Sequence, residues 1–243
     1  MRMLGALTIA VLAAVSPVVQ AASPAMVLNE WNCVGDDKKL ANNGSDPIFG
    51  QHDGNGGNWI ELVVVEDDLD IRGWVLEWQN DDEAGNHGTV DFVTIYEESE
   101  NADTYLSEIP AGTTITIMEG EEGSQDFGQG SWGDASDLDI SANRIHILLS
   151  DDSVVHHSGA LKVDNDGWRM RILKPTDPED ETPSFPADYT VVQSWVGEDI
   201  APGWSGSAIN SQEVGYLTAD PTVTDISAGN YYQDNDSSTF GTP

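Results

Sequence analysis

The chain has 243 residues, of which 39% are hydrophobic and eight are tryptophan, so it has enough apolar material for the packed core of one large domain. Nine lysine and arginine residues stand against 43 aspartate and glutamate residues, for a formal net charge of -34. This balance excludes binding to DNA, RNA or anionic lipid, because no basic surface exists to replace the counterions of phosphate groups.

Two causes of the acidity stay open. A carboxylate-rich surface suits a salty medium, in which ions screen the self-repulsion of the chain. Carboxylates also coordinate Ca²⁺, a hard cation that takes oxygen ligands. The charges are spread over most of the chain, which favours adaptation to salt as the main cause.

The first segment is typical of a secretory signal peptide. Residues 1–3 give a positive start, residues 4–19 are almost all apolar, and Val19-Gln20-Ala21 is a small-residue cleavage pattern. We therefore predict a signal peptide at 1–21 and a mature chain at 22–243 that is secreted or held at the cell surface. The alternative is an uncleaved membrane anchor, but the apolar run is short for a spanning helix.

The mature chain is a succession of short β-type runs separated by clusters of Gly, Asn, Asp and Pro. The predicted strands are 26–34, 58–66, 72–79, 90–96, 113–119, 144–149, 168–173 and 189–196. Eight strands with no intervening helix predict an all-β sandwich or barrel with long acidic loops. Residues 175–186, with four prolines, predict an extended surface segment within a single domain rather than a linker between two.

Alternation within these runs predicts which faces are buried. Ile60 and Leu62 share one face of their strand and Glu61 lies on the other, where Val63 follows, so this strand should be central and covered on both faces. Arg171 faces away from its apolar neighbours and predicts an acidic partner. The only cysteine, Cys33, excludes an internal disulfide and is expected to be a small buried residue.

Three segments, in this order, resemble the lamin tail domain family, in particular its bacterial secreted type. They are Val-Leu-Asn-Glu at 27–30, Gly-Asn-Trp-Ile-Glu-Leu at 57–62 and Leu-Asp-Ile-Arg-Gly-Trp-Val-Leu at 69–76. The motif positions are Asn29, Glu30, Trp59, Ile60, Glu61, Leu62, Gly73 and Trp74. Weaker matches are the Pro-x-Gly turn at 109–113 and the closing segment 238–243, while the loops are longer than in a compact member.

The resemblance implies an immunoglobulin-like β-sandwich. It also implies a non-catalytic extracellular or surface-associated binding module, because secreted bacterial members are similar to accessory proteins of adhesion or of linked hydrolases. In lamins the domain docks proteins and chromatin, and the charge of this chain excludes the chromatin role. The motif residues are then structural, with Gly73 allowing a close approach or a bulge. The expected partner is an unidentified protein or surface polysaccharide.

Enzyme hypotheses find less support. Glu30 and Glu61 are the best carboxylate pair for a glycoside hydrolase, but the family motifs explain both without chemistry. His156 and His157 beside Asp151 are zinc-ligand types, yet adjacent residues of a strand point to opposite faces, so at most one could join His146. We predict no catalytic residue and no cofactor apart from a candidate Ca²⁺ site.

Candidate Ca²⁺ sites have closely spaced oxygens at 53–58, at Asp164 and Asp166, and at 234–237, the second being the best of the three. Ordinary turn chemistry explains each of them as well. The alternative function is a carbohydrate-binding sandwich in which exposed tryptophans form a stacking surface. Its candidates are Trp78, Trp132, Trp195 and Trp204.

Overall fold

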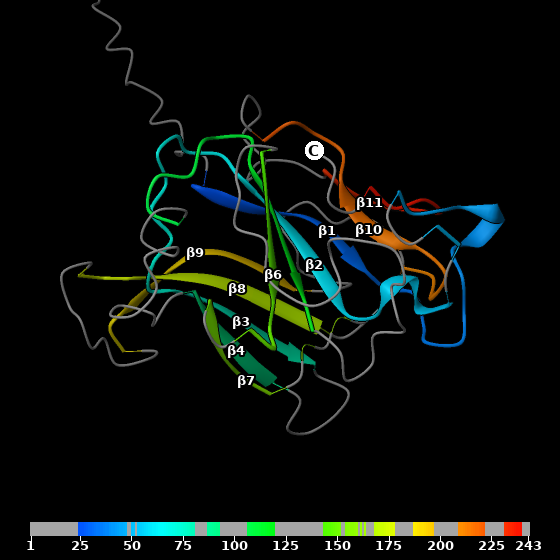
Figure 1. The fold of residues 1–243 in the computed structure, drawn as a ribbon, viewed down its shortest axis with the longest axis horizontal. Coiled ribbons are helices and arrows are strands. Elements are labelled where there is room, and N and C mark those ends of the chain that lie inside the picture. Colours follow the sequence, from blue (N-terminus) through cyan, green and yellow to red (C-terminus); the bar gives the residue numbers. More distant parts are fainter. Residues whose placement is uncertain are drawn as a thin grey trace, which may run out of the picture.

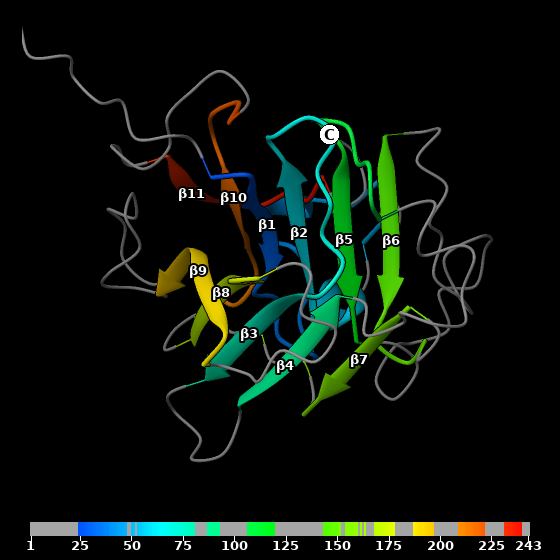
Figure 2. The ribbon, with the colours of Figure 1, turned by 90° about the vertical axis from the view of Figure 1, so that its left-hand side faces the viewer.

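The computed structural model describes residues 24–47, 50–51, 53–80, 87–92, 106–119, 143–151, 154–159, 161, 163, 168–177, 187–196, 209–221 and 231–239. Within them the regular secondary structure is almost entirely β-strand, with two short 3-10 turns at Ala41–Asn43 and Asp53–Gly56. None of these residues belongs to a helix with the length and apolar character needed to cross a membrane. The strands form two sheets that face each other (Figures 1 and 2).

The six-stranded sheet has the order β11-β10-β1-β2-β5-β6. Its strands are β1 (Met26–Asn32), β2 (Trp59–Val64), β5 (Thr114–Met118), β6 (Arg144–Leu148), β10 (Val214–Leu217) and β11 (Tyr232–Asn235). Neighbouring strands are antiparallel except β5 and β6, which are parallel.

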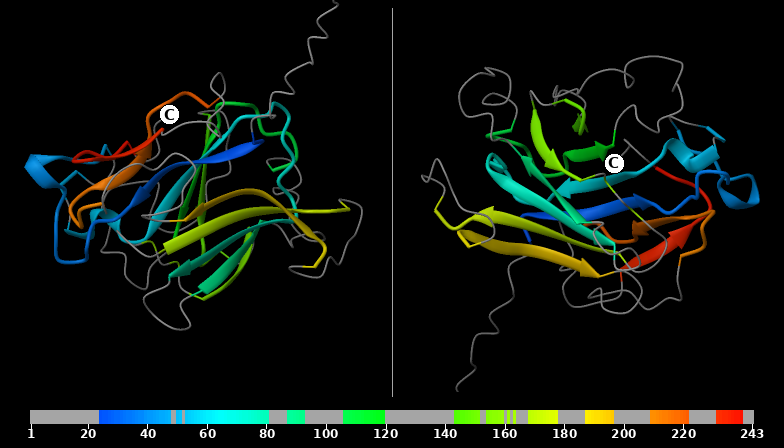
Figure 3. Two further views of the ribbon diagram at one scale, coloured as in Figure 1. Left: turned by 180° about the vertical axis from the view of Figure 1, so that it is seen from behind. Right: turned by 90° about the horizontal axis from the view of Figure 1, so that it is seen from below.

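The five-stranded sheet is antiparallel throughout and has the order β7-β4-β3-β8-β9. Its strands are β3 (Trp74–Asn80), β4 (His87–Phe92), β7 (Val155–Ser158), β8 (Trp168–Pro175) and β9 (Tyr189–Val196). The two views of Figure 3 show it as a separate layer from the six-stranded sheet. The predicted all-β, two-layer architecture is therefore confirmed.

The main core lies between the two sheets. Ile60, Leu62 and Ile115 enter it from the six-stranded sheet, and Leu76 and Met170 from the five-stranded sheet, each at most 1% exposed. Full burial of such a side chain contributes about 1.5–3 kcal/mol to the free energy of folding. The predicted inward faces of these strands are therefore confirmed.

A second apolar cluster lies on the outer face of the six-stranded sheet. It consists of Val34, Leu40, Trp59, Met118, Leu148 and Val214. Val34 and Leu40, which follow β1, cover this end of the sheet, and the Trp59 indole Nε1–H donates to the Asn55 carbonyl at 2.8 Å. All six residues of β2 are consequently buried, as predicted for a central strand covered on both faces.

Other local predictions are also confirmed. Arg171 forms an ion pair with Glu77 on the neighbouring strand β3, and Cys33 is buried. Strands β8 and β9 are neighbours in one sheet, and Thr176 N–H donates to the Asp188 carbonyl at 2.7 Å, while most of the predicted extended segment 175–186 lies outside the described residues. Three strands were not predicted: β7, β10 and β11 are only four residues long.

Candidate functional site

A row of polar side chains crosses the outer face of the six-stranded sheet. Strand register places one residue of each of five neighbouring strands in line. The row runs Tyr216, Glu30, Glu61, Thr116 and His146. All but Tyr216 are at most 1% exposed, so this polar row is buried although it lies outside the main core.

Glu30 holds the last described segment of the chain against the sheet. Thr239 N–H lies 3.0 Å from both carboxylate oxygens, and Thr239 Oγ1 donates to Oε2 at 2.6 Å. Burial raises the pKa of Glu30 to about 7, and Asp46 raises it slightly further, although the bonds from Thr239 and Ser238 act in the opposite direction. Near neutral pH this group therefore changes charge inside the fold.

Glu61 is held by a bulge in β1. The β1–β2 register shifts between Leu28 and Glu30, which leaves Asn29 as an extra residue. Its side-chain Nδ2–H donates to Glu61 Oε1 at 2.5 Å. In the Asn-Glu motif at 29–30, Glu30 thus binds the 238–239 segment and Asn29 binds Glu61 of the neighbouring strand β2.

His146 ends the polar row on β6. Its Nδ1 lies 2.7 Å from Thr116 Oγ1, across the parallel pair β5–β6. Burial lowers the pKa of His146 to about 3, and the charge of Arg144 lowers it further. The His146 imidazole is consequently neutral near pH 7, where the chain has a net charge of -34.

The polar row does not have the geometry of an open catalytic centre. The structure brings Glu30 and Glu61 together as direct cross-strand partners, but both carboxylates are buried and bonded to protein groups. His156 and His157 are exposed on β7 of the other sheet, so neither joins His146. In the described part of the chain, no three His, Cys, Asp or Glu side chains are grouped so as to hold a metal ion.

An open cleft lies where the chain crosses from β2 of one sheet to β3 of the other. Its volume is about 410 Å³, within the range of small-ligand sites. It is lined by Ala25, Glu66, Asp68, Leu69, Asp70, Arg72, Trp74, Lys174, Pro175 and Thr176. Two of the chain's nine basic residues therefore line this cleft.

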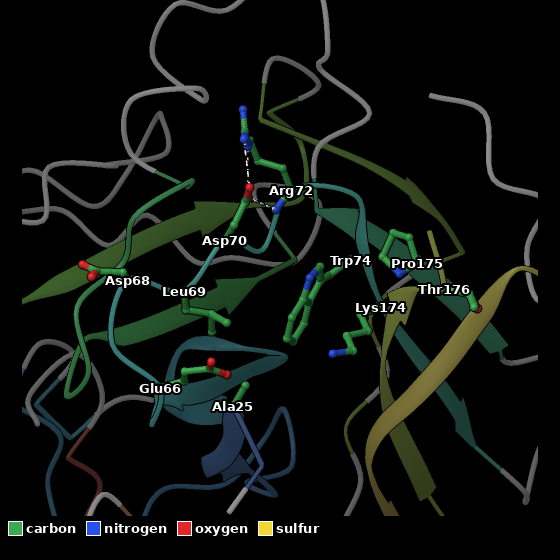
Figure 4. A pocket seen from close by; sticks show the side chains of 10 residues that line it. All are labelled: Ala25, Glu66, Asp68, Leu69, Asp70, Arg72, Trp74, Lys174, Pro175 and Thr176. Carbon is green, nitrogen blue, oxygen red and sulfur yellow. Dashed lines mark hydrogen bonds and ion pairs between the residues drawn. The ribbon is translucent and has the colours of Figure 1, made fainter. Parts of the chain in front are cut away.

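The two cations of the cleft differ in their bonding. Arg72 makes a two-pronged ion pair with Asp70, with Nε to Oδ1 at 3.0 Å and Nη2 to Oδ2 at 2.8 Å. Lys174 is exposed and makes no ion pair within the described residues. Figure 4 shows Lys174 on one side of the Trp74 ring and Glu66 on the other. The cleft thus presents an ammonium and a carboxylate on opposite sides of an indole.

Gly73 shapes the rim of the cleft through a turn. Trp74 N–H donates to the Ile71 carbonyl at 3.0 Å, and Gly73, the third residue of this turn, has a φ of 75°. A positive φ favours glycine because a Cβ is strained there. The turn directs Trp74 toward the core, where it is 6% exposed, so only a small part of the ring borders the cleft.

The candidate Ca²⁺ sites fall into three groups. Asp164 and Asp166 lie outside the described residues. In the 53–58 loop, Asn32 Nδ2 donates to the Gly54 carbonyl at 2.8 Å and to the Gly57 carbonyl at 2.5 Å. These oxygens already have partners, so the loop serves to cover the sheet.

The third group lies at the end of β11. Asp236 accepts a hydrogen bond from Asn42 Nδ2 at 2.7 Å. Burial raises the pKa of Glu213, and the neighbouring Asp234 and Asp236 raise it further. The carboxyl groups here therefore repel one another.

Of the four tryptophans predicted to form an exposed stacking surface, the structure describes the side chain of one, Trp78. Trp78 is 1% exposed and belongs to the core between the sheets, because it lies on the inner face of β3. Its proposed exposure was wrong. Trp132 and Trp204 lie outside the described residues, as does the side chain of Trp195.

Sequence reasoning named Glu30 and Glu61 as a pair, but it did not predict that both are buried, and it missed the cleft. Arg72 and Trp74 were visible in the third motif, whereas Lys174 and Glu66 carried no sequence signal. Comparison with protein-family models, with curated proteins and with solved structures finds no match for this chain.

Proposed function

We propose that the chain is an exported, non-catalytic binding module with a lamin-tail-type, immunoglobulin-like sandwich. The observation that carries this proposal is the contrast between its buried and its exposed polar groups. The carboxylates with catalytic potential, Glu30 and Glu61, are buried and bonded to Thr239 and Asn29. The open cleft instead offers Lys174, an exposed ammonium suited to contacting a ligand.

The placement of the family motifs supports the sandwich type. The first two motifs lie on the paired strands β1 and β2, and the third leads through the Gly73 turn into β3 of the facing sheet. Thr113 N–H donates to the Pro110 carbonyl at 3.2 Å in the turn that precedes β5. The closing Ser238-Thr239 segment meets Glu30 of the opening motif. Each motif residue has a structural role, as a scaffold requires.

A combined retention and turnover assay tests the function. The purified mature chain is mixed with a panel of insoluble polysaccharides and protein-coated beads, and both bound protein and released sugar are measured. We expect retention on at least one surface, no released sugar, and weaker retention of Lys174→Glu. Lys39→Glu, an exposed lysine outside the cleft that pairs with Asp53 at 3.6 Å, serves as the control.

Turnover that disappears in Glu61→Gln would show a catalytic role and contradict the proposal. Absence of retention on every surface would also contradict it. Retention that Lys174→Glu leaves unchanged would remove the cleft from the binding surface.

A further inference from the structure

In the described part of the chain, β9 is the longest of the four edge strands of the two sheets. β9 pairs with β8 on one side, and in the described part of the chain no strand pairs with its other side. An open edge presents backbone N–H and C=O groups that can pair with another strand. Proteins commonly guard such edges with short strands or charged side chains.

The other three edges carry these protections. β7 and β11 are four residues long and β6 is five, and they contain two histidines, Asp234 and Arg144 respectively. β9 is eight residues long, Tyr-Thr-Val-Val-Gln-Ser-Trp-Val, with no acidic, basic or histidine residue. Its composition is rich in the β-branched and aromatic types that favour strands.

Val191 points out from this edge strand. At 46%, it is the one large hydrophobic side chain found exposed among those whose burial the structure describes, which leave out 193–196 of the same strand. The next residue, Val192, packs against the core instead. Two independent features, the unguarded edge and the exposed apolar side chain, therefore coincide on one strand.

A bulge limits how much of the edge a partner can use. Leu173 pairs with Val191 and Ile172 pairs with Gln193, so Val192 is an extra residue. The regular run beyond the bulge is 193–196. A partner strand therefore pairs over a few residues and gains further contact from Val191.

We infer that the β9 edge binds an extended segment of another protein by strand addition, and that this segment is uncharged in its middle and basic at its ends. The edge deepens the proposed binding function, on which it rests, by naming the surface and the kind of partner. Main-chain pairing supplies affinity in this mode of recognition, and side chains supply specificity.

The charge of the partner follows from the sequence around β9. Asp177, Glu179, Asp180, Glu181 and Asp188 precede the strand, and Glu198 and Asp199 follow it. Lysine or arginine at both ends of an incoming strand would complement these groups. A second copy of this chain is disfavoured, because antiparallel β9–β9 pairing would bring acidic stretches together and each chain carries a net charge of -34.

A labelled synthetic peptide tests the edge. The probe is Lys-Lys-Thr-Val-Thr-Val-Thr-Lys-Lys, and its binding to the mature chain is followed by fluorescence anisotropy. We expect saturable binding that weakens with NaCl, and binding at least about tenfold weaker when the peptide ends are glutamate. Amide hydrogen exchange should slow in β9 when the peptide is bound.

Two changes probe the pairing itself. Val191→Lys should weaken binding about tenfold, whereas Gln233→Lys, an exposed position on the edge strand β11, should leave it unchanged. N-methylation of alternate peptide bonds in the probe should abolish binding, because those bonds can no longer donate to β9. The protein itself is unchanged in this experiment, so the test holds even where Val191→Lys fails to fold.

Equal binding of the N-methylated peptide, or protection in a strand other than β9, would overturn the inference. So would concentration-dependent dimerisation that Val191→Lys abolishes, because the occupant would then be a second copy. The protein could be retained on a surface without turnover in the retention assay and still not bind the peptide. That result would overturn the assignment of binding to the β9 edge and leave the proposed function standing.

Discussion

Glu30 on β1 and Glu61 on β2 are direct cross-strand partners, and they are 1% and 0% exposed. A buried carboxylate costs free energy unless hydrogen bonds or protonation compensate for its lost hydration. Asn29 donates to Glu61, and Thr239 donates to Glu30. The opening motif and the closing segment of the chain therefore stabilise the same pair of side chains.

Removal of the Asn29 amide should expose the cost of burying Glu61. We expect Asn29→Ala to lower the free energy of unfolding by about 1–3 kcal/mol, because the Glu61 carboxylate loses a donor. In the Glu61→Gln background the same change should cost less. Urea unfolding of the four variants of this cycle gives the coupling; equal costs in both backgrounds would show that the two residues do not interact.

The pKa values of Glu30 and His146 predict opposite pH dependences. Glu30 binds its proton more tightly in the folded state, with a pKa of about 7 against an ordinary 4.5, so its contribution to stability is lost as pH rises from 4.5 through 7. His146 has a pKa of about 3 against 6.5, so its contribution is lost as pH falls from 6.5 toward 3. Between pH 4.5 and 6.5 the two effects oppose each other.

Single substitutions should therefore reveal slopes that cancel in the natural chain. Relative to it, we expect the stability of Glu30→Gln to rise with pH across this window, and that of His146→Asn to fall. Each slope should reach at most about 1.4 kcal/mol per pH unit. Urea unfolding at a series of pH values measures them, and parallel curves for all three proteins would be incompatible with buried, titrating side chains.

Gly215 should be intolerant of a side chain for a steric reason. It pairs with Trp31 across β10 and β1, and a Cβ at this position would overlap the Trp31 indole, which packs on Tyr232 with ring centroids 5.7 Å apart. We expect Gly215→Ala to cost about 2–4 kcal/mol, typical of overpacking with loss of core contacts.

Gly112→Ala is the matched control. Gly112 has a φ of 85° and nothing within 4 Å of an added Cβ, so only backbone strain of about 1 kcal/mol is expected. Thermal melting of both variants, with tryptophan fluorescence as a second readout, checks the difference. A larger loss for Gly112→Ala would mean that Trp31 does not lie over Gly215.

Salt should stabilise the fold through screening. With a net charge of -34, we expect the melting temperature to rise with NaCl, since ions reduce the repulsion among carboxylates. At matched ionic strength, CaCl₂ should give a similar rise if salt adaptation is the main cause of the acidity. A much larger rise with CaCl₂ would instead indicate specific calcium sites.

The sequence was sufficient to predict the two-layer β architecture and the inward faces of β2 and β5, because both follow from alternation along a strand. It was not sufficient for Glu30. Strict alternation from Leu28 would place Glu30 on the same face, but the bulge at Asn29 moves it to the outer face beside Glu61. No local pattern marks a bulge of this kind.

The short strands and the cleft were missed for related reasons. β11 contains Asp234 and Asn235, residues typical of turns, and it forms a strand because β10 supplies a partner. The cleft joins residues 65–73 to the β8 end through tertiary packing, so neither segment shows a signal alone. Lys174 in particular is a candidate binding residue only because the fold places it in one cleft with Trp74 and Glu66.

The central claim is that the outer face of the six-stranded sheet is closed over the two glutamates, which serve the fold. The most direct test is a carbon-13 NMR titration of glutamate side-chain carboxyls in the mature chain, with Glu30→Gln used to assign the Glu30 signal. The account predicts a Glu30 midpoint near pH 7. A midpoint at the ordinary value of 4.5 would show that water reaches this carboxylate and would contradict the claim.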